Sequence, residues 1–260
     1  MPAKSPVAAG LRQCILRYHS AMPIAAVFLV FLTIFALDGC VTRSGVDGQT
    51  EASFDPRYLA KTEIDRVIDA NRAEVMASLR RVAEKFYRRN PSEWKKAKLP
   101  GLDAALGRLF SGTVDFPELG GRREGAAVQY AFSGDYAGDR VLAVMAGLIG
   151  MVDAAFEYKD FFYAFDGLNE QKLYNCARNV EIAVWKISSA RAANGQSLLI
   201  SNELDRDHPN LSFEREFGRI IGLLDFMSGI VADGHGRSVT RLTQSVATAV
   251  FLPVGTLGIR

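Results

Sequence analysis

Two short segments hold histidine next to carboxylates, the residue types that many hydrolases use. They are Glu203, Asp205, Asp207 and His208 in a predicted loop, and Asp233 with His235 at the end of a predicted helix. A histidine oriented by a carboxylate can act as a general base, so a hydrolase is one function class if the two loops meet. Acidic loops and glycine-flanked turns are also ordinary helix connections, and no GxSxG nucleophile motif is present. We therefore predict no catalytic residue and keep a hydrolase as the least favoured alternative.

Metal and phosphate motifs are absent from the sequence. Beyond residue 39 the histidines are His208 and His235, and no HxxxH, HExxH or CxxC spacing occurs. The glycine-rich residues 120–125 include Arg122, Arg123 and Glu124 but lack the GxxxxGK[ST] pattern of a phosphate-binding loop. We expect the two arginines to point into water. The sequence predicts neither a metal site nor a cofactor.

The densest group of aromatic residues lies between Phe156 and position 165. Positions 161 and 163 point about 200° apart on a helix, so one helical stripe cannot hold the whole group. Either a helix here is buried on several sides, or some of these rings face a ligand or a partner protein, since aromatic side chains dominate such sites. The candidate ligand or partner surface comprises Tyr158, Phe161, Phe162, Tyr163 and Phe165.

The first 40 residues have the three parts of an export signal. Residues 1–22 carry Lys4, Arg12 and Arg17 and no acidic residue, and residues 23–37 form an uncharged run of 15 residues. That length suits the apolar core of a signal peptide and is short of the roughly 20 residues of a membrane-spanning helix. The run ends in the tetrad Leu37-Asp38-Gly39-Cys40.

This tetrad resembles the lipobox of bacterial lipoproteins, although Asp38 stands where a small or hydroxyl residue is usual. The resemblance implies cleavage before Cys40, diacylglyceryl transfer to its thiol and acylation of the new amino group by a fatty acid such as palmitate. Two or three acyl chains make a stable anchor. Val41 in place of aspartate after the cysteine resembles the signal for outer-membrane delivery, with the domain in the periplasm. A Gram-positive cell surface is the alternative.

Composition limits the partners of the exported chain. The leader takes three of the 31 basic and one of the 29 acidic side chains, which leaves 28 of each. A neutral domain favours neither nucleic acid nor an anionic membrane surface. Cys176 is then the one cysteine besides Cys40, so an intramolecular disulfide is not expected and a packed core must supply stability. We expect Cys176 to be a small core residue.

Hydrophobic periodicity predicts helices through most of the chain after a polar tether at residues 40–55. Helices are expected over residues 64–89, 101–110, 140–156 and 213–233, and one from Asn169 to a stop at Asn194-Gly195. Residues 111–139 contain six glycines and predict a loop, with a short extended piece near 126–132. Gly147 and Gly150 predict close helix packing in the apolar segment 140–156, because glycine otherwise weakens a helix. A further helix should end at Pro253, and residues 245–259 should dock into the core.

The sequence thus predicts a signal peptide at 1–39, a lipidated linker at 40–55 and a single all-α domain at 56–260. That domain should be bundle-like, with six to eight helices around the apolar helix 140–156. We expect a membrane-anchored envelope lipoprotein that is not an enzyme and serves as an accessory subunit binding another envelope protein. A helical module that binds a small molecule or lipid is the alternative.

Overall fold

The chain divides into two compact units, residues Met1–Leu59 and Ala60–Arg260. The computed structural model describes residues 42–44, 50–52, 61–112, 115–164, 166–203, 210–236, 239 and 250–255. In the first unit β1 (Thr42–Ser44) pairs antiparallel with β2 (Thr50–Ala52), so the predicted tether contains a short hairpin that the sequence analysis did not foresee. The predicted signal peptide and Cys40 lie outside the described residues.

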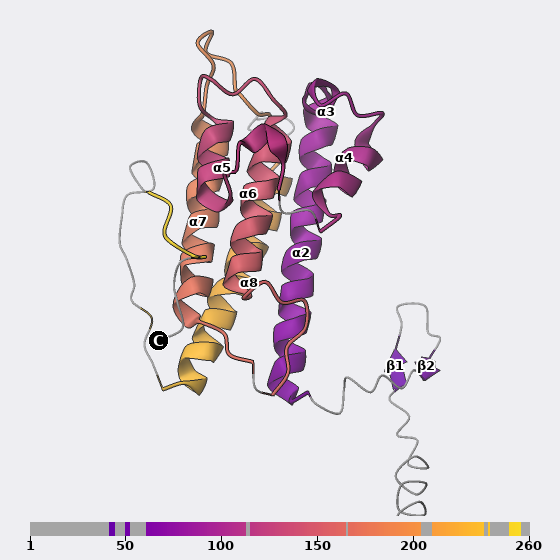
Figure 1. The fold of residues 1–260 in the computed structure, drawn as a ribbon, viewed down its shortest axis with the longest axis vertical. Helices are drawn as coiled ribbons and strands as arrows, with labels where there is room; N and C mark the ends of the chain where they lie inside the picture. The colour runs from indigo at the N-terminus through magenta and orange to yellow at the C-terminus, as the bar shows by residue number, and fades with distance from the viewer. Residues whose placement is uncertain are drawn as a thin grey trace, which may run out of the picture. The chain divides into compact units, whose positions relative to one another are not determined.

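The second unit is all-α, as predicted. Figure 1 shows four long helices side by side, α2 (Glu63–Arg89), α6 (Arg140–Ala155), α7 (Glu170–Ser189) and α8 (Ser212–Gly234). Helix α6 packs on α2 and α7, and α8 packs on the same two helices from the other side. The shorter helices are α3 (Pro91–Lys96), α4 (Leu102–Leu109), the 3-10 turn η2 (Pro117–Leu119) and α5 (Glu124–Ala131). The seven α-helices of the described part match the predicted six to eight.

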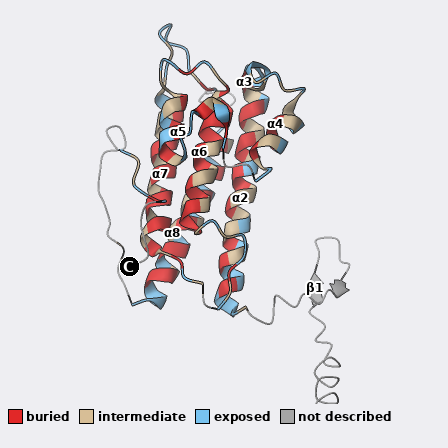
Figure 2. Cartoon of the chain, in the orientation of Figure 1, coloured by how far each residue is buried: buried red, intermediate tan, exposed pale blue. Residues whose placement is uncertain are grey.

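Helix α6 is the centre of the core, which confirms the prediction for residues 140–156. Most of its side chains are fully buried, and buried residues line the inward faces of the surrounding helices (Figure 2). Asp139 caps its first turn by accepting a hydrogen bond from the Leu142 N–H at 2.9 Å. Cys176 of α7 is also fully buried in this core, and burial raises the pKa of its thiol. The cysteine is therefore a core residue, as expected.

Helix α2 begins and ends where local sequence signals place it. Thr62 and Asp65 form a reciprocal capping box at the N-terminus. At the other end, Pro91 cannot continue the helix, and the Asn90 amide instead bridges to a distant loop. It donates to the Ile200 carbonyl at 2.9 Å and accepts from the Ile200 N–H at 2.8 Å.

Two predicted features are wrong. Residues 124–131 form helix α5, where the sequence analysis placed a loop and an extended piece. This helix packs on α6, and packing supplies stability that was not expected in a stretch with glycines on both sides of it. Helix α7 ends at Ser189, five residues before the predicted stop. Asn194 and Gly195 instead form the turn of a small loop closed by the bridge between Arg191 and Ser197.

The C-terminal residues 250–255 dock on α7. Asn179 holds them by two hydrogen bonds, accepting from the Leu252 N–H at 2.7 Å and donating to its carbonyl at 2.8 Å. Val254 is buried, which agrees with the predicted docking for this part of residues 245–259. The predicted helix before Pro253 lies outside the described residues. Within the part of the chain that the structure describes, no helix is both long and apolar enough to cross a membrane.

Candidate binding cleft

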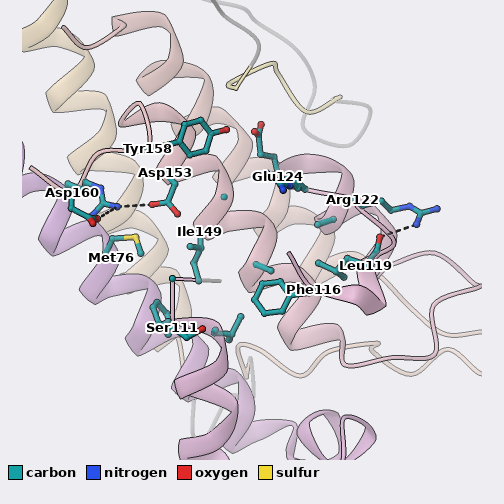
Figure 3. Close-up of a pocket in the computed structure, with 18 residues that line it drawn as sticks. Met76, Ser111, Phe116, Leu119, Arg122, Glu124, Ile149, Asp153, Tyr158 and Asp160 are labelled. Carbon is teal, nitrogen blue, oxygen red and sulfur yellow. Dashed lines mark hydrogen bonds and ion pairs between the residues drawn. The ribbon is translucent and has the colours of Figure 1, made fainter. Parts of the chain in front are cut away.

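A cleft of about 400 Å³ opens between α2, the end of α4, α5 and α6. Figure 3 shows its residues converging from these elements and from the turn that follows α6. The floor is apolar and is made by side chains of five different segments. They are Met76, Leu109, Phe110, Phe116, Leu119, Ala127, Ala146 and Ile149.

One end of the cleft is charged. The Arg72 guanidinium donates to Asp153 at 2.8 Å and contacts Asp160 at 2.9 Å. Burial raises the pKa of Asp153; Arg72 opposes this shift, and the neighbouring Asp160 adds to it. The Arg72 Nε is buried without a hydrogen-bond partner. One cation therefore serves two carboxylates here, and one of those carboxylates is partly desolvated.

Glu124 and Tyr158 meet beside this cluster, and both have unusual backbones. Their φ angles are +49° and +56°, in the left-handed region that L-residues avoid at a cost of about 1–2 kcal/mol each. The pKa of Tyr158 is raised, first by burial and then by the Glu124 carboxylate, which is both a nearby charge and a hydrogen-bond acceptor. The Gly255 N–H also donates to Glu124 Oε2, at 3.4 Å.

Glycines on two other segments lie very close to Glu124. A Cβ on Gly147 would lie 2.6 Å from the Glu124 carbonyl oxygen, and a Cβ on Gly255 would lie 2.5 Å from Glu124 Oε1. Both distances are far below van der Waals contact, and at Gly147, where the neighbouring atom is backbone, the approach depends on glycine. The prediction of close packing at Gly147 is confirmed. At Gly150 the nearest atom would be 3.6 Å away, an ordinary contact.

The two arginines before Glu124 are exposed, as expected, but both interact with other residues of the same chain. Arg122 lies 4.0 Å from the centre of the Tyr130 ring and donates to the Leu119 carbonyl at 3.1 Å. Arg123 is paired with Asp115 at 2.5 Å. Both line the rim of the cleft.

The predicted aromatic surface is divided by the structure. Residues 156–164 form a turn and an irregular segment, not a helix. Phe162 is fully buried and packs edge-to-face on Phe156 with ring centres 6.2 Å apart, so it belongs to the core and not to a surface. Tyr158 and Phe161 are 59% and 50% exposed, and Tyr163 is half-buried. Of the members of this set that the structure describes, only Tyr158 lines the cleft. Phe165 lies outside the described residues.

The two histidine segments do not form one site in the described part of the chain. Glu203 pairs with Arg89 at the end of α2, near the start of α8, whereas His235 follows the end of α8. The 23 residues of α8 span about 35 Å, so these groups are far apart. His235 Nδ1 lies 3.3 Å from Glu170 Oε2 and outside the cleft. Asp205, Asp207 and His208 lie outside the described residues.

Sequence reasoning missed Glu124 as a site residue, because its partners come from distant positions. Tyr158 and Gly255 lie 34 and 131 residues further along the chain. Among the described residues, no group of three histidine, cysteine or acidic side chains is arranged to hold a metal ion. No protein family model, curated protein or solved structure matches this chain.

Proposed function

We propose that this chain is a lipid-anchored envelope protein whose helical unit binds a small amphipathic molecule in the cleft. The apolar run 23–37 and the tetrad that ends in Cys40 support the proposed lipid anchor. Lipid on Cys40 would keep the helical unit near a membrane, which we propose to be the outer membrane on its periplasmic side.

The observation that carries the binding function is the meeting of Glu124 and Tyr158 at the polar end of an apolar cleft. Two residues in costly left-handed conformations lie side by side here, and glycines from separate segments approach Glu124 closely. Strain of this kind persists where the surrounding structure enforces it, and it is concentrated at functional sites. A cleft with an apolar floor and a few convergent polar groups is the usual form of a small-molecule site.

A second candidate is the binding of another envelope protein, and one exposed surface favours it. Glu74 of α2 pairs with Arg219 of α8 at 3.2 Å. One heptad further along this antiparallel pair come Val67 and Phe226, which are 42% and 60% exposed. Exposed apolar side chains thus stand on both helices, seven residues along from the ion pair. Exposed aromatic residues of this kind are common in protein interfaces.

The anchor is tested by expressing the full chain and a Cys40→Ser variant in a Gram-negative host with an alkyne-labelled fatty acid. We expect label and membrane association for the native chain and neither for the variant. The variant retains Cys14 and Cys176, so it separates lipidation of Cys40 from labelling of other thiols. An unmodified Cys40 in the native protein would contradict the proposed anchor.

The binding function is tested by thermal-shift screening of small compounds that combine one polar group with an aromatic or alkyl body. Ala146→Phe fills the floor of the cleft, whereas Ala126→Phe adds the same ring at an exposed position of α5. We expect hits that stabilise the native chain and Ala126→Phe but not Ala146→Phe. Hits that stabilise both variants equally would place binding outside the cleft, and a screen without hits would count against ligand binding.

A further inference from the structure

The C-terminal residues 250–255, here named the strap, lie beside α7 (Figure 1). Two buried asparagines, one helical turn apart on α7, hold the main chain of the strap. Asn179 bonds to both main-chain groups of Leu252, and Asn175 donates to the Pro253 carbonyl at 2.8 Å. With the strap docked, Asn179 is 1% and Asn175 is 4% exposed. Three main-chain groups of a short segment are thus satisfied by side chains on one face of a helix.

Two side chains of the strap fit the same surface. Val254 is 1% exposed, and Phe251 lies against Gly125 of α5. A Cβ on Gly125 would lie 2.6 Å from Phe251 Cβ and 2.7 Å from its Cγ, so the ring approaches this closely because position 125 has no side chain. We name this surface, with Gly125 of α5 and with Asn175 and Asn179 of α7, the strap groove.

The strap groove has the two parts of a peptide-binding site. Hydrogen bonds to the main chain give affinity for an irregular or extended segment, and pockets for individual side chains give specificity. Asn175 and Asn179 supply the hydrogen bonds, and the positions that receive Phe251 and Val254 supply the pockets. These contacts depend on the sequence of the strap and not on its covalent link to α8. The groove is therefore suited to the same segment from another molecule.

A second copy of the chain carries this segment. Because its residues are identical, the fit within one chain also holds between two copies. Thirteen residues, 237–249, connect the end of the α8 region to the strap, and they span up to about 45 Å when extended. This reach exceeds the length of about 35 Å of α8 itself. The connection is thus long enough for a strap to reach a neighbouring copy, and exchange of such an element is a low-cost route to dimers.

We infer that the strap groove is a peptide-binding site that accepts residues 250–255 from a second copy as well as from its own chain. The inference goes beyond the proposed ligand of the cleft and does not depend on it. Covalent attachment gives a chain's own strap an effective concentration on the order of millimolar, so exchange is favoured where copies are concentrated. In an exchanged pair, the Gly255 N–H that bonds to Glu124 comes from the other copy.

The groove is vacated in the full-length chain by a substitution in the strap itself. Val254→Asp would bury a carboxylate, and Leu252→Pro removes the N–H that donates to Asn179. Either change should release the strap and leave the groove intact. Faster amide hydrogen exchange in residues 250–255 verifies the release, and circular dichroism verifies that the helices remain.

The probe is a fluorescein-labelled peptide with the native sequence of residues 249–256, and its anisotropy reports binding. We expect the peptide to bind Val254→Asp at least about tenfold more tightly than the native chain, whose own strap competes with it. Adding Asn179→Ala should lower this affinity about tenfold, because two hydrogen bonds are lost. Adding Asn194→Ala, at an exposed position after α7, is the matched control and should leave the affinity unchanged.

A change of shape in the groove tests where the peptide lies. Gly125→Ala, added to Val254→Asp, should weaken the native peptide because the new Cβ would overlap Phe251. A peptide with Phe251→Gly lacks the overlapping atoms, so Gly125→Ala should not weaken it further.

Exchange between copies is tested with two full-length variants that fail in different parts. Asn179→Ala keeps the strap and impairs the groove, whereas Val254→Asp keeps the groove and impairs the strap. Differently tagged copies of the two variants, mixed in detergent, should co-purify, and the free peptide should separate them. Two tagged forms of Val254→Asp, which both lack a working strap, should not co-purify.

Two results would overturn the inference at the groove. They are the failure of the peptide to bind both Val254→Asp and Leu252→Pro, and binding that Asn179→Ala leaves unchanged. A complementary pair that co-purifies no better than two copies of Val254→Asp would overturn the exchange between copies. The compound screen on the native chain reports on the cleft and is independent of these outcomes.

Discussion

Replacing Gly147 by alanine tests whether the contact between α5 and α6 depends on a missing side chain. The new Cβ would lie 2.6 Å from both the Glu124 carbonyl oxygen and Val128 Cγ2, and 3.1 Å from the Val128 N. Ordinary carbon contacts are about 3.5–4.0 Å. Two of these three atoms belong to the backbone of α5, so relief requires the whole helix to shift by close to 1 Å.

The net effect is the difference between two terms. Alanine in a helix interior is favoured over glycine by about 1 kcal/mol. Overpacking a filled core costs about 1–3 kcal/mol, and a clash with backbone lies toward the upper end. We therefore expect Gly147→Ala to lower the free energy of unfolding by about 1–2 kcal/mol despite the gain in helix propensity.

Gly150→Ala is the matched control on the same helix. Its Cβ would meet nothing closer than 3.6 Å, so the propensity gain should remain and stabilise the protein by about 0.5–1 kcal/mol. The two variants should differ by about 2 kcal/mol, or about 4–8 °C in Tm for a unit of this size. Urea unfolding followed by circular dichroism measures the difference. The packing argument is refuted if Gly147→Ala is as stable as Gly150→Ala.

Three further predictions concern capping, backbone strain and the C-terminal segment. Burial raises the pKa of Asp139 to about 6 from 3.8, so the folded state holds a proton that the unfolded state has lost between about pH 4 and 6. The contribution of Asp139 to stability is therefore lost as pH rises through this window. Asp139→Asn keeps a capping oxygen and does not titrate. In urea unfolding, the free energy of unfolding of this variant minus that of the native chain should rise by about 1–3 kcal/mol from pH 4 to pH 7. The same difference at both pH values would contradict this prediction. Lys98→Gly, at an exposed residue with φ +54°, should raise Tm by removing strain of about 0.5–1 kcal/mol, and an unchanged or lower Tm argues against strain there. Asn179→Ala should lower the free energy of unfolding by about 1–2 kcal/mol and speed amide hydrogen exchange in residues 250–255, because both hydrogen bonds to Leu252 are lost. Unaltered exchange would mean that other contacts hold the segment.

The sequence predicted the long helices well because their signals are local. In α2, apolar residues at three- and four-residue steps face the core, and Asn90-Pro91 ends the pattern. The segment that forms α6 was expected in the core because nearly all of its side chains are apolar, and a helix that is apolar on all sides is buried.

Helix α5 escaped prediction because its stability is tertiary. Its buried positions are small, among them Gly125, Ala127 and Ala131, and they give little amphipathic signal. Gly125 marks a contact, since a Cβ there would lie 2.6 Å from Phe251 of the C-terminal segment. A glycine that allows another chain segment to approach looks, in sequence alone, the same as a glycine that ends a helix.

The candidate site was predicted only in part for a related reason. Tyr158 was named from the density of aromatic residues around it, but Phe162 of the same group fills the core. Aromatic content indicates that a segment contacts something and does not tell which rings face inward. Glu124 carried no signal of its own, because its role depends on glycines and a tyrosine brought from other segments by the fold.

The proposed binding site therefore depends on how α5 packs on α6. Because Gly147 has no side chain, α5 lies so close to α6 that a Cβ there would be 2.6 Å from the Glu124 carbonyl oxygen. Packed helices tend to shift as rigid bodies. A substitution in the core behind Glu124 should therefore move α5 as a whole and carry the Glu124 carboxylate with it. The shape of the cleft therefore depends on the packing of α5 on α6 and also on loop residues that line it, such as Phe116, Tyr158 and Asp160.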